Sequence, residues 1–221
     1  KIPDNNMDFV IASTLPIALA TMHNAIVKIG NFTKGQTILI QGASSGVGLM
    51  GIQMAKNLGA KLVIGTSTKP EKFDKLKSIG ADLVVNSKDK DWVDQVLQAN
   101  NNEGIDLIID QLSGYTINEN MKASKVKGTI VNVGRLAGGS EKFNCDLHAL
   151  RRINYRGVTF RTRSKNEIRE IYSKMWNDFR ELVVTGKLSL PIEKIFEFND
   201  VADALSCMRE NQHFGKLILK V

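Results

Sequence analysis

The sequence predicts an α/β fold: a doubly wound, six-stranded parallel sheet with helices on both faces, followed by C-terminal helical and strand segments. Short apolar runs alternate with helical stretches through more than half of the 221 residues. The runs are almost continuously apolar, which is typical of strands covered on both faces. Such an alternation is typical of a parallel sheet with crossover helices.

Each element follows from a local pattern. A helix is expected over residues 12–29, with Pro16 near its start, where proline is tolerated. Pro70 opens a later helix, and Gly59 and Gly80 each follow the end of one. The expected strands are 37–41, 61–65, 83–86, 105–110, 129–133 and 157–161, and the helices between them are 46–58, 70–79, 91–99 and 116–124.

The alternation stops after residue 164. The following segments are expected to be a charged helix over 166–185, a strand over 192–196, a helix over 200–209 and a strand over 216–221. We therefore divide the chain into a leading segment with its helix (1–30), a dinucleotide-binding domain of the Rossmann type (31–164) and C-terminal segments (165–221). The chain opens on Lys1 rather than Met, so we expect it to be part of a longer protein.

Composition narrows the class of protein. The chain is 43% hydrophobic and 24% charged, as ordinary globular proteins are. Its two cysteines, Cys145 and Cys207, are far apart and form no CxxC pair, which excludes a thiolate zinc cluster and fits a reducing, cytoplasmic compartment. The net charge of +7 is interpreted as a scattered surface charge, densest over 151–163. No apolar run suggests a membrane span and no motif suggests nucleic acid, so we expect neither partner.

The turn after the first strand predicts a phosphate site. It reads Gly42-Ala43-Ser44-Ser45-Gly46-Val47-Gly48 and lies between a strand and a helix, the context that gives such a loop meaning. Backbone N–H groups of residues 45–48 would face an anion, helped by the helix dipole. Gly46 and Gly48 would allow close approach of a pyrophosphate.

Two families of dinucleotide-binding enzymes use loops of this kind. The spacing also fits the loop of short-chain dehydrogenases, which need a Tyr followed four residues later by a Lys. None of the three tyrosines, Tyr115, Tyr155 and Tyr172, has a lysine at that distance. The short-chain interpretation therefore fails.

The second strand bears on the choice of dinucleotide. An acidic residue at its end would bind the ribose 2′-OH of NAD. Here Thr66, Ser67 and Lys69 follow instead, with Lys72 a turn later and no carboxylate before Glu71. Hydroxyls and cations suit a 2′-phosphate, so NADPH is favoured over NADH, although surface lysines are common.

Several motifs resemble one family in order along the chain. They are Leu15-Pro16-Ile17-Ala18, Ala43-x-x-Gly46-Val47-Gly48, Gly80-Ala81-Asp82, the strand 105–114, the segment 128–134 and His213-Phe214-Gly215-Lys216. Together they are similar to the quinone-oxidoreductase-like, zinc-independent branch of the medium-chain dehydrogenases/reductases. The resemblance implies metal-free hydride transfer from NADPH to a small-molecule acceptor, either a quinone or the C=C bond of an enone or enoyl thioester. No dedicated catalytic residue is assigned.

The resemblance also implies a set of cofactor-binding residues, taken over position by position. Ser44, Ser45, Gly46, Val47 and Gly48 would hold the pyrophosphate. The 2′-phosphate would lie against Thr66, Ser67 and Lys72. The remaining contacts would come from Asp110, Gln111, Leu112, Val133, Gly134, Arg135, Phe160, Arg161, Asn211 and Lys216.

The chain departs from the family in two respects. His23 replaces a tyrosine of the leading helix, and is interpreted as packing at the domain seam. The family also has an N-terminal substrate domain ahead of this helix. The sequence starts just before the helix, so the acceptor site is expected to be incomplete. A non-catalytic dinucleotide-binding or interaction module, using the basic 151–163 segment, remains the alternative. A homodimer through an edge strand at 158–163 is expected as well.

Overall fold

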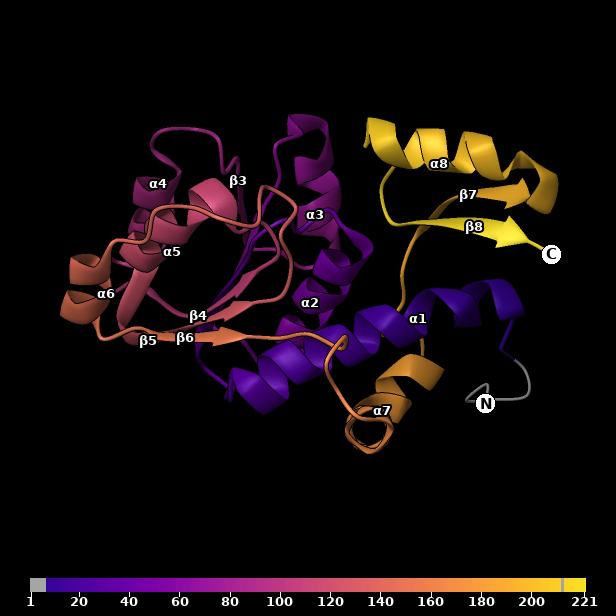
Figure 1. Cartoon of the computed structure of the whole chain (residues 1–221), viewed down its shortest axis with the longest axis horizontal. Helices are drawn as coiled ribbons and strands as arrows, with labels where there is room; N and C mark the ends of the chain where they lie inside the picture. The colour runs from indigo at the N-terminus through magenta and orange to yellow at the C-terminus, as the bar shows by residue number, and fades with distance from the viewer. Residues whose placement is uncertain (1–6, 212) are drawn as a thin grey trace.

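The structure is a computed structural model that describes residues 7–211 and 213–221. This part of the chain contains a parallel six-stranded sheet in the order β3-β2-β1-β4-β5-β6 (Figure 1). The strands are β1 (Thr37–Ile40), β2 (Leu62–Thr66), β3 (Leu83–Val85), β4 (Ile105–Asp110), β5 (Ser124–Asn132) and β6 (Asn154–Gly157). The strand order reverses between β1 and β4. The carboxyl ends of these two strands therefore face the crevice where doubly wound sheets bind ligands.

Helices cover both faces of the sheet, which confirms the doubly wound class. One layer contains α2 (Gly46–Asn57) and α3 (Phe73–Ile79), the latter entered through the 3₁₀ turn η2 (Pro70–Lys72). The other layer contains α4 (Trp92–Ala99), α5 (Ile117–Ala123), entered through the 3₁₀ turn η3 (Gly114–Thr116), and α6 (Cys145–Arg151). A separate buried apolar cluster lies under each layer, so the sheet is covered on both sides as its apolar strands predict.

The leading helix is longer than expected. It comprises α1 (Phe9–Met22) and a π-helix, η1 (His23–Ile29), so Pro16 lies inside the helix rather than near its start. Its length and composition are those of a membrane-spanning helix, contrary to expectation, and 56% of its most apolar window is buried within the protein. Burial on that scale is typical of a core helix.

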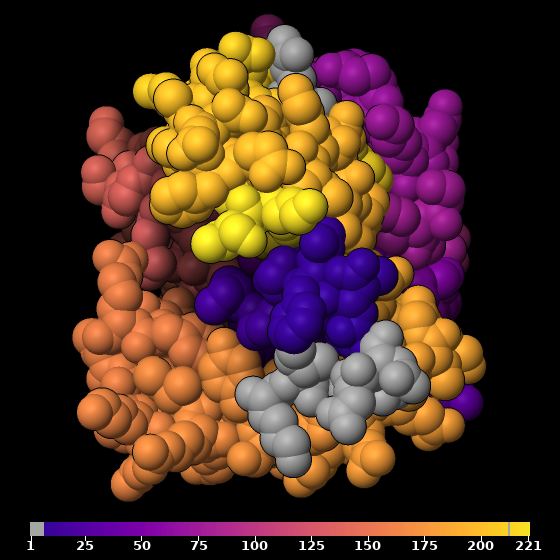
Figure 2. All heavy atoms as spheres, turned by 90° about the vertical axis from the view of Figure 1, so that its right-hand side faces the viewer, coloured from indigo at the N-terminus to yellow at the C-terminus, as the bar shows by residue number. Residues whose placement is uncertain are grey.

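The C-terminal segments form a small βαβ unit and one long helix. The unit consists of β7 (Ile192–Glu197), the 3₁₀ turn η4 (Phe198–Asp200), α8 (Val201–Glu210) and β8 (Lys216–Lys220), and β7 pairs with β8 in parallel. The long helix is α7 (Lys165–Val184). Figure 2 shows the start of α1 wedged between the βαβ unit and the segments around α7.

The sixth strand corrects the sequence-based prediction. It lies at Asn154–Gly157 and not at 157–161, and residues 158–163 form a loop. The strand was misplaced because its side chains are mostly polar and exposed, as an edge strand permits, whereas Val158 just beyond it is apolar and buried in the core. The predicted dimer contact at 158–163 therefore cannot be a strand.

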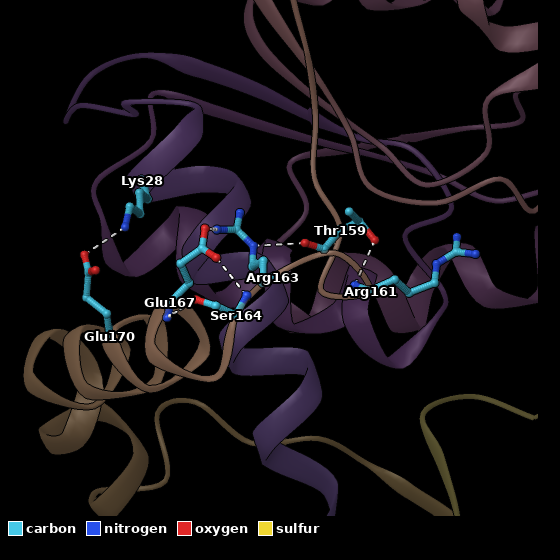
Figure 3. Close-up of polar contacts among 7 residues, drawn as sticks. All are labelled: Lys28, Thr159, Arg161, Arg163, Ser164, Glu167 and Glu170. Atoms are coloured by element: carbon cyan, nitrogen blue, oxygen red, sulfur yellow. Dashed lines mark hydrogen bonds and ion pairs between the residues drawn. The ribbon is translucent and has the colours of Figure 1, made fainter.

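The loop after β6 leads into a well-capped α7. Ser164 and Glu167 cap this helix reciprocally, and the hydrogen bond from Ser164 N lowers the pKa of Glu167 (Figure 3). Arg163 donates to the carbonyl oxygen of Thr159, and Lys28 of η1 pairs with Glu170 at 3.0 Å. These contacts hold the loop and the first turns of α7 against the π-helix.

Candidate cofactor site

The loop between β1 and α2 allows no side chain at its last glycine. A Cβ atom on Gly48 would lie 2.6 Å from the carbonyl oxygens of both Gly42 and Ala43. Gly42 itself has a φ of +67°, a backbone conformation that favours glycine. The helix therefore packs directly on the loop backbone.

The first turn of α2 presents free donors. Ser45 is the N-cap residue, and its Oγ accepts from Gly48 N at 3.0 Å. Within residues 7–211 and 213–221, no acceptor takes up the N–H groups of Gly46 and Val47. Two unpaired N–H groups at the positive end of a helix dipole are donors of the kind that bind anions.

A buried polar network supports this loop from below. The side-chain amide of Gln41 donates to Asn120 Oδ1 at 2.6 Å, and its oxygen accepts from Thr66 Oγ1 at 2.8 Å. Thr66 Oγ1 in turn accepts from Gly42 N at 3.0 Å. The Gln111 side-chain amide donates to Gln41 O at 3.0 Å. The network joins the carboxyl ends of β1, β2 and β4, so the loop position is fixed by three strands.

Asp110 ends β4 inside the protein. Its Oδ1 accepts from the N–H groups of Leu112 and Ser113, both at 2.9 Å, while Oδ2 has no partner among the described residues. Burial raises the pKa of this carboxyl, and the two backbone hydrogen bonds oppose the rise. The carboxyl acts as a turn former, and Ser113 adopts a φ of +55° beside it.

The β4 and β5 ends are joined at the expected nicotinamide side. The N–H groups of Val133 and Gly134 donate to Asp110 O at 2.7 and 3.2 Å. A Cβ atom on Gly134 would lie 2.5 Å from Gln111 O, so the two turns touch through backbone. The structure thus brings residues 110–112 and 133–135 together, with Arg135 exposed at the rim.

The residues expected at the 2′-phosphate are turned inward. Thr66 and Ser67 are buried; Thr66 belongs to the network above, and Ser67 Oγ accepts from Lys69 N at 3.2 Å. Lys72 is only 3% exposed, its Nζ donates to the carbonyl oxygens of Asn211 and His213, and burial lowers its pKa. Lys69, by contrast, keeps 41% of its side chain exposed.

Lys216 reaches the phosphate loop from the C-terminal unit. Its Cδ lies 2.9 Å from the position that a Cβ atom on Gly46 would take. Its ammonium has no acidic partner within the described residues. The Lys216 side chain therefore brings a positive charge close to the free N–H groups at the start of α2.

Phe160 and Arg161 lie in the loop after β6 and not on a strand. The Arg163 guanidinium lies 5.9 Å from the Phe160 ring centroid, and Arg161 N donates to Thr159 Oγ1. The side chain of Arg161 points away from both Thr159 and Arg163 (Figure 3). Their expected role at the nicotinamide stays a prediction.

Sequence reasoning missed the polar residues beneath the site. Asn132 ends β5, and its side-chain amide donates to Ser113 Oγ and to Gly134 O. Gln41 and Asn132 share one signal, a polar residue at the carboxyl end of a buried apolar run. His23, expected to pack at a domain seam, is buried, and its Nε2 lies 2.7 Å from Oδ2 of Asp178 in α7.

Comparisons with known proteins agree with this geometry. The family described as zinc-binding dehydrogenases matches residues 46–177, more than half of the chain. Highly reducing polyketide synthase 40 of Fusarium pseudograminearum is 27% identical over all of this chain and 9% of its own length. An alcohol dehydrogenase structure from Sinorhizobium meliloti 1021 is 28% identical, with a TM-score of 0.83 over 98% of this chain and 60% of that one.

The fold is also that of the CurK enoyl reductase, at 24% identity and a TM-score of 0.83 over 98% of this chain and 64% of that chain. The chain spans about a tenth of the length of the curated relatives it matches. The family description names zinc, but the described residues contain no group of three His, Cys, Asp or Glu that could hold a metal. By its family match and its motifs, the chain belongs to the zinc-binding dehydrogenases, among the medium-chain dehydrogenases/reductases, and comprises their dinucleotide-binding part.

Proposed function

We propose that this chain binds NADPH and serves a reductase that transfers hydride to an enoyl thioester. The observation that carries the proposal is the start of α2, where the N–H groups of Gly46 and Val47 have no acceptor among the described residues and the Lys216 side chain lies beside Gly46. Ser45–Gly48 and Lys216 would hold the pyrophosphate. When bound, the dinucleotide supplies a hydride at its nicotinamide.

The chain's own residues contribute position rather than acid–base chemistry. The turns at 110–112 and 133–135 are locked together through backbone contacts, so they form a rigid wall for the nicotinamide. Rigid placement of the reacting ring accounts for much of the catalysis available to a hydride-transfer enzyme.

The preference for NADPH rests on the end of β2. No carboxylate lies between Thr66 and Lys69 to bind a ribose 2′-OH. Lys69 is an exposed cation at this end, with its Nζ 3.9 Å from the exposed Glu71 Oε1, whereas Lys72 donates to backbone carbonyls. A 2′-phosphate beside Lys69 would be favoured by its charge.

The acceptor is proposed from the relatives. Several are polyketide synthases by name, and a neighbour in fold is an enoyl reductase, which favours an enoyl thioester. A solved quinone oxidoreductase shares the fold as well, which keeps a quinone as the second candidate.

Titration with each dinucleotide tests the cofactor proposal. We expect quenching of protein fluorescence by NADPH at concentrations at least about tenfold lower than by NADH, which corresponds to about 1.4 kcal/mol. Absence of NADPH binding would contradict the loop assignment. Oxidation of NADPH by the full-length protein, with crotonyl thioester and with a quinone, then separates the acceptors. Binding without turnover of either would favour a non-catalytic module.

We propose a second copy of this chain as the partner of β6. Among the described residues no strand pairs with the outer edge of β6, and Val158 N donates to Asn132 O, so the N–H of Gly157 points away from β5. Gly157→Pro removes that outward donor, whereas Gly157→Ala keeps it. We expect light scattering to give a dimer for the native protein and for Gly157→Ala, and a monomer for Gly157→Pro. A monomeric native protein would refute the proposal.

A further inference from the structure

Lys72 links the dinucleotide-binding domain to the C-terminal unit. It lies in η2, at the adenosine end of the expected cofactor site. Its Nζ donates to the carbonyl oxygens of Asn211, at 3.0 Å, and His213, at 2.8 Å. With 3% of its surface exposed, the side chain is enclosed by these contacts. A buried ammonium is stable only when its N–H groups donate to acceptors, so these two hydrogen bonds are what stabilises Lys72 in its buried position.

The segment that Lys72 contacts runs from the end of α8 to the phosphate loop. We call residues 211 and 213–216 the strap. Phe214 N donates to Glu193 Oε2 at 3.3 Å, and Lys75 Nζ lies 5.4 Å from the Phe214 ring centroid. Lys216 N donates to Pro191 O at 2.9 Å. Gly215 has a φ of +100° and no room for a Cβ atom beside Pro191.

The two ends of the strap are therefore held by two lysines in opposite directions. Lys72 extends from the domain to the strap, and Lys216 extends from the strap back to Gly46 of the phosphate loop. The position of Lys216 over the loop depends on where the strap lies. Lys72 contributes to that position by donating to two strap carbonyls, beside the bond from Lys216 N to Pro191 O and the pairing of β8 with β7.

We infer that Lys72 is a positioning residue that holds Lys216 over the pyrophosphate site, rather than a ligand of the 2′-phosphate. This inference rests on the proposed dinucleotide function for its effect on affinity, but not for its effect on the strap. It gives different roles to Lys69 and Lys72, which the sequence alone does not distinguish. Lys69 would distinguish NADPH from NADH, whereas Lys72 would strengthen the binding of both through the pyrophosphate they share.

Hydrogen exchange of the ligand-free protein tests the strap directly. In Lys72→Met we expect exchange at the amides of Phe214 and Lys216 to rise at least about tenfold, with exchange in β4 unchanged. Lys77→Met, an exposed lysine of α3, is the matched control and should leave the strap unchanged. A rise in β4 as large as that in the strap would mean global destabilisation and would overturn the inference, as would unchanged strap exchange.

Affinity measurements test the second half of the inference. We expect Lys72→Met to raise the dissociation constants of NADH and NADPH by the same factor, about five- to twentyfold. In a Lys216→Met background it should have no further effect, because its action passes through Lys216. A loss confined to NADPH, or one that persists without Lys216, would make Lys72 a direct ligand. If neither dinucleotide binds the native protein, the proposed function fails while the exchange result still decides the strap.

Discussion

Replacing Gly48 with alanine is expected to remove measurable dinucleotide binding and to lower the free energy of unfolding by about 1–3 kcal/mol. The new methyl group would lie 2.6 Å from two backbone carbonyl oxygens, those of Gly42 and Ala43. Backbone cannot rotate aside as a side chain can, so the first turn of α2 must move. The free N–H groups of Gly46 and Val47 move with it. A displacement of about 1 Å in a positioned group can cost about a hundredfold in function.

Gly139→Ala is the matched control for this change. Gly139 has no atom within 4 Å of its Cβ position and an ordinary φ, so both stability and binding should be native. Fluorescence titration with NADPH and urea denaturation measure the two effects. Gly46→Ala should have a stability and an affinity between those of Gly48→Ala and Gly139→Ala, since its methyl group would meet the flexible side chain of Lys216. Native affinity in Gly48→Ala would show that the loop does not form the anion site.

The elements that could be predicted from the sequence are those with strong local patterns. The strand at 105–110 was placed at its observed bounds because it is an apolar run closed by polar residues. The edge strand β6 carries no such pattern, since it is held by backbone pairing with β5 and buries no apolar side chain of its own. Helix α6 was missed for a related reason: none of its seven residues is buried, so it has no apolar stripe.

The location of the site in the fold could be predicted from the sequence, but the directions and partners of its side chains could not. Glycines and strand ends located the crevice, because carboxyl ends of parallel strands meet at one edge of the sheet. The same reasoning could not tell that Thr66 bonds to Gln41, or that Lys72 bonds to a segment about 140 residues later in the chain. Such partners are set by tertiary packing, and sequence proximity carries no information about them.

Replacing Gln41 with leucine is expected to destabilise the protein by about 2–4 kcal/mol, as one or two buried polar groups each lose a partner at about 1–3 kcal/mol. Gln41 has no exposed surface, and its amide is bonded at both ends, to Asn120 and to Thr66. Leucine fills the volume but leaves Asn120 Oδ1 and the Thr66 hydroxyl without this partner. Urea denaturation should show a lower midpoint with an unchanged slope.

Two variants decide whether that loss comes from the unmet hydrogen bonds. Gln98→Leu, on the exposed surface of α4, should change stability by less than about 0.5 kcal/mol. Adding Asn120→Leu to Gln41→Leu should recover part of the loss, because removing both partners leaves fewer unsatisfied groups than removing one. If the double variant is instead less stable than the sum of the single changes, packing rather than hydrogen bonding holds this position. The rigidity of the phosphate loop would then rest less on the hydrogen bonds of Gln41 than on the bond from Gly42 N to Thr66 Oγ1 and on the contact between Gly48 and the backbone of Gly42 and Ala43.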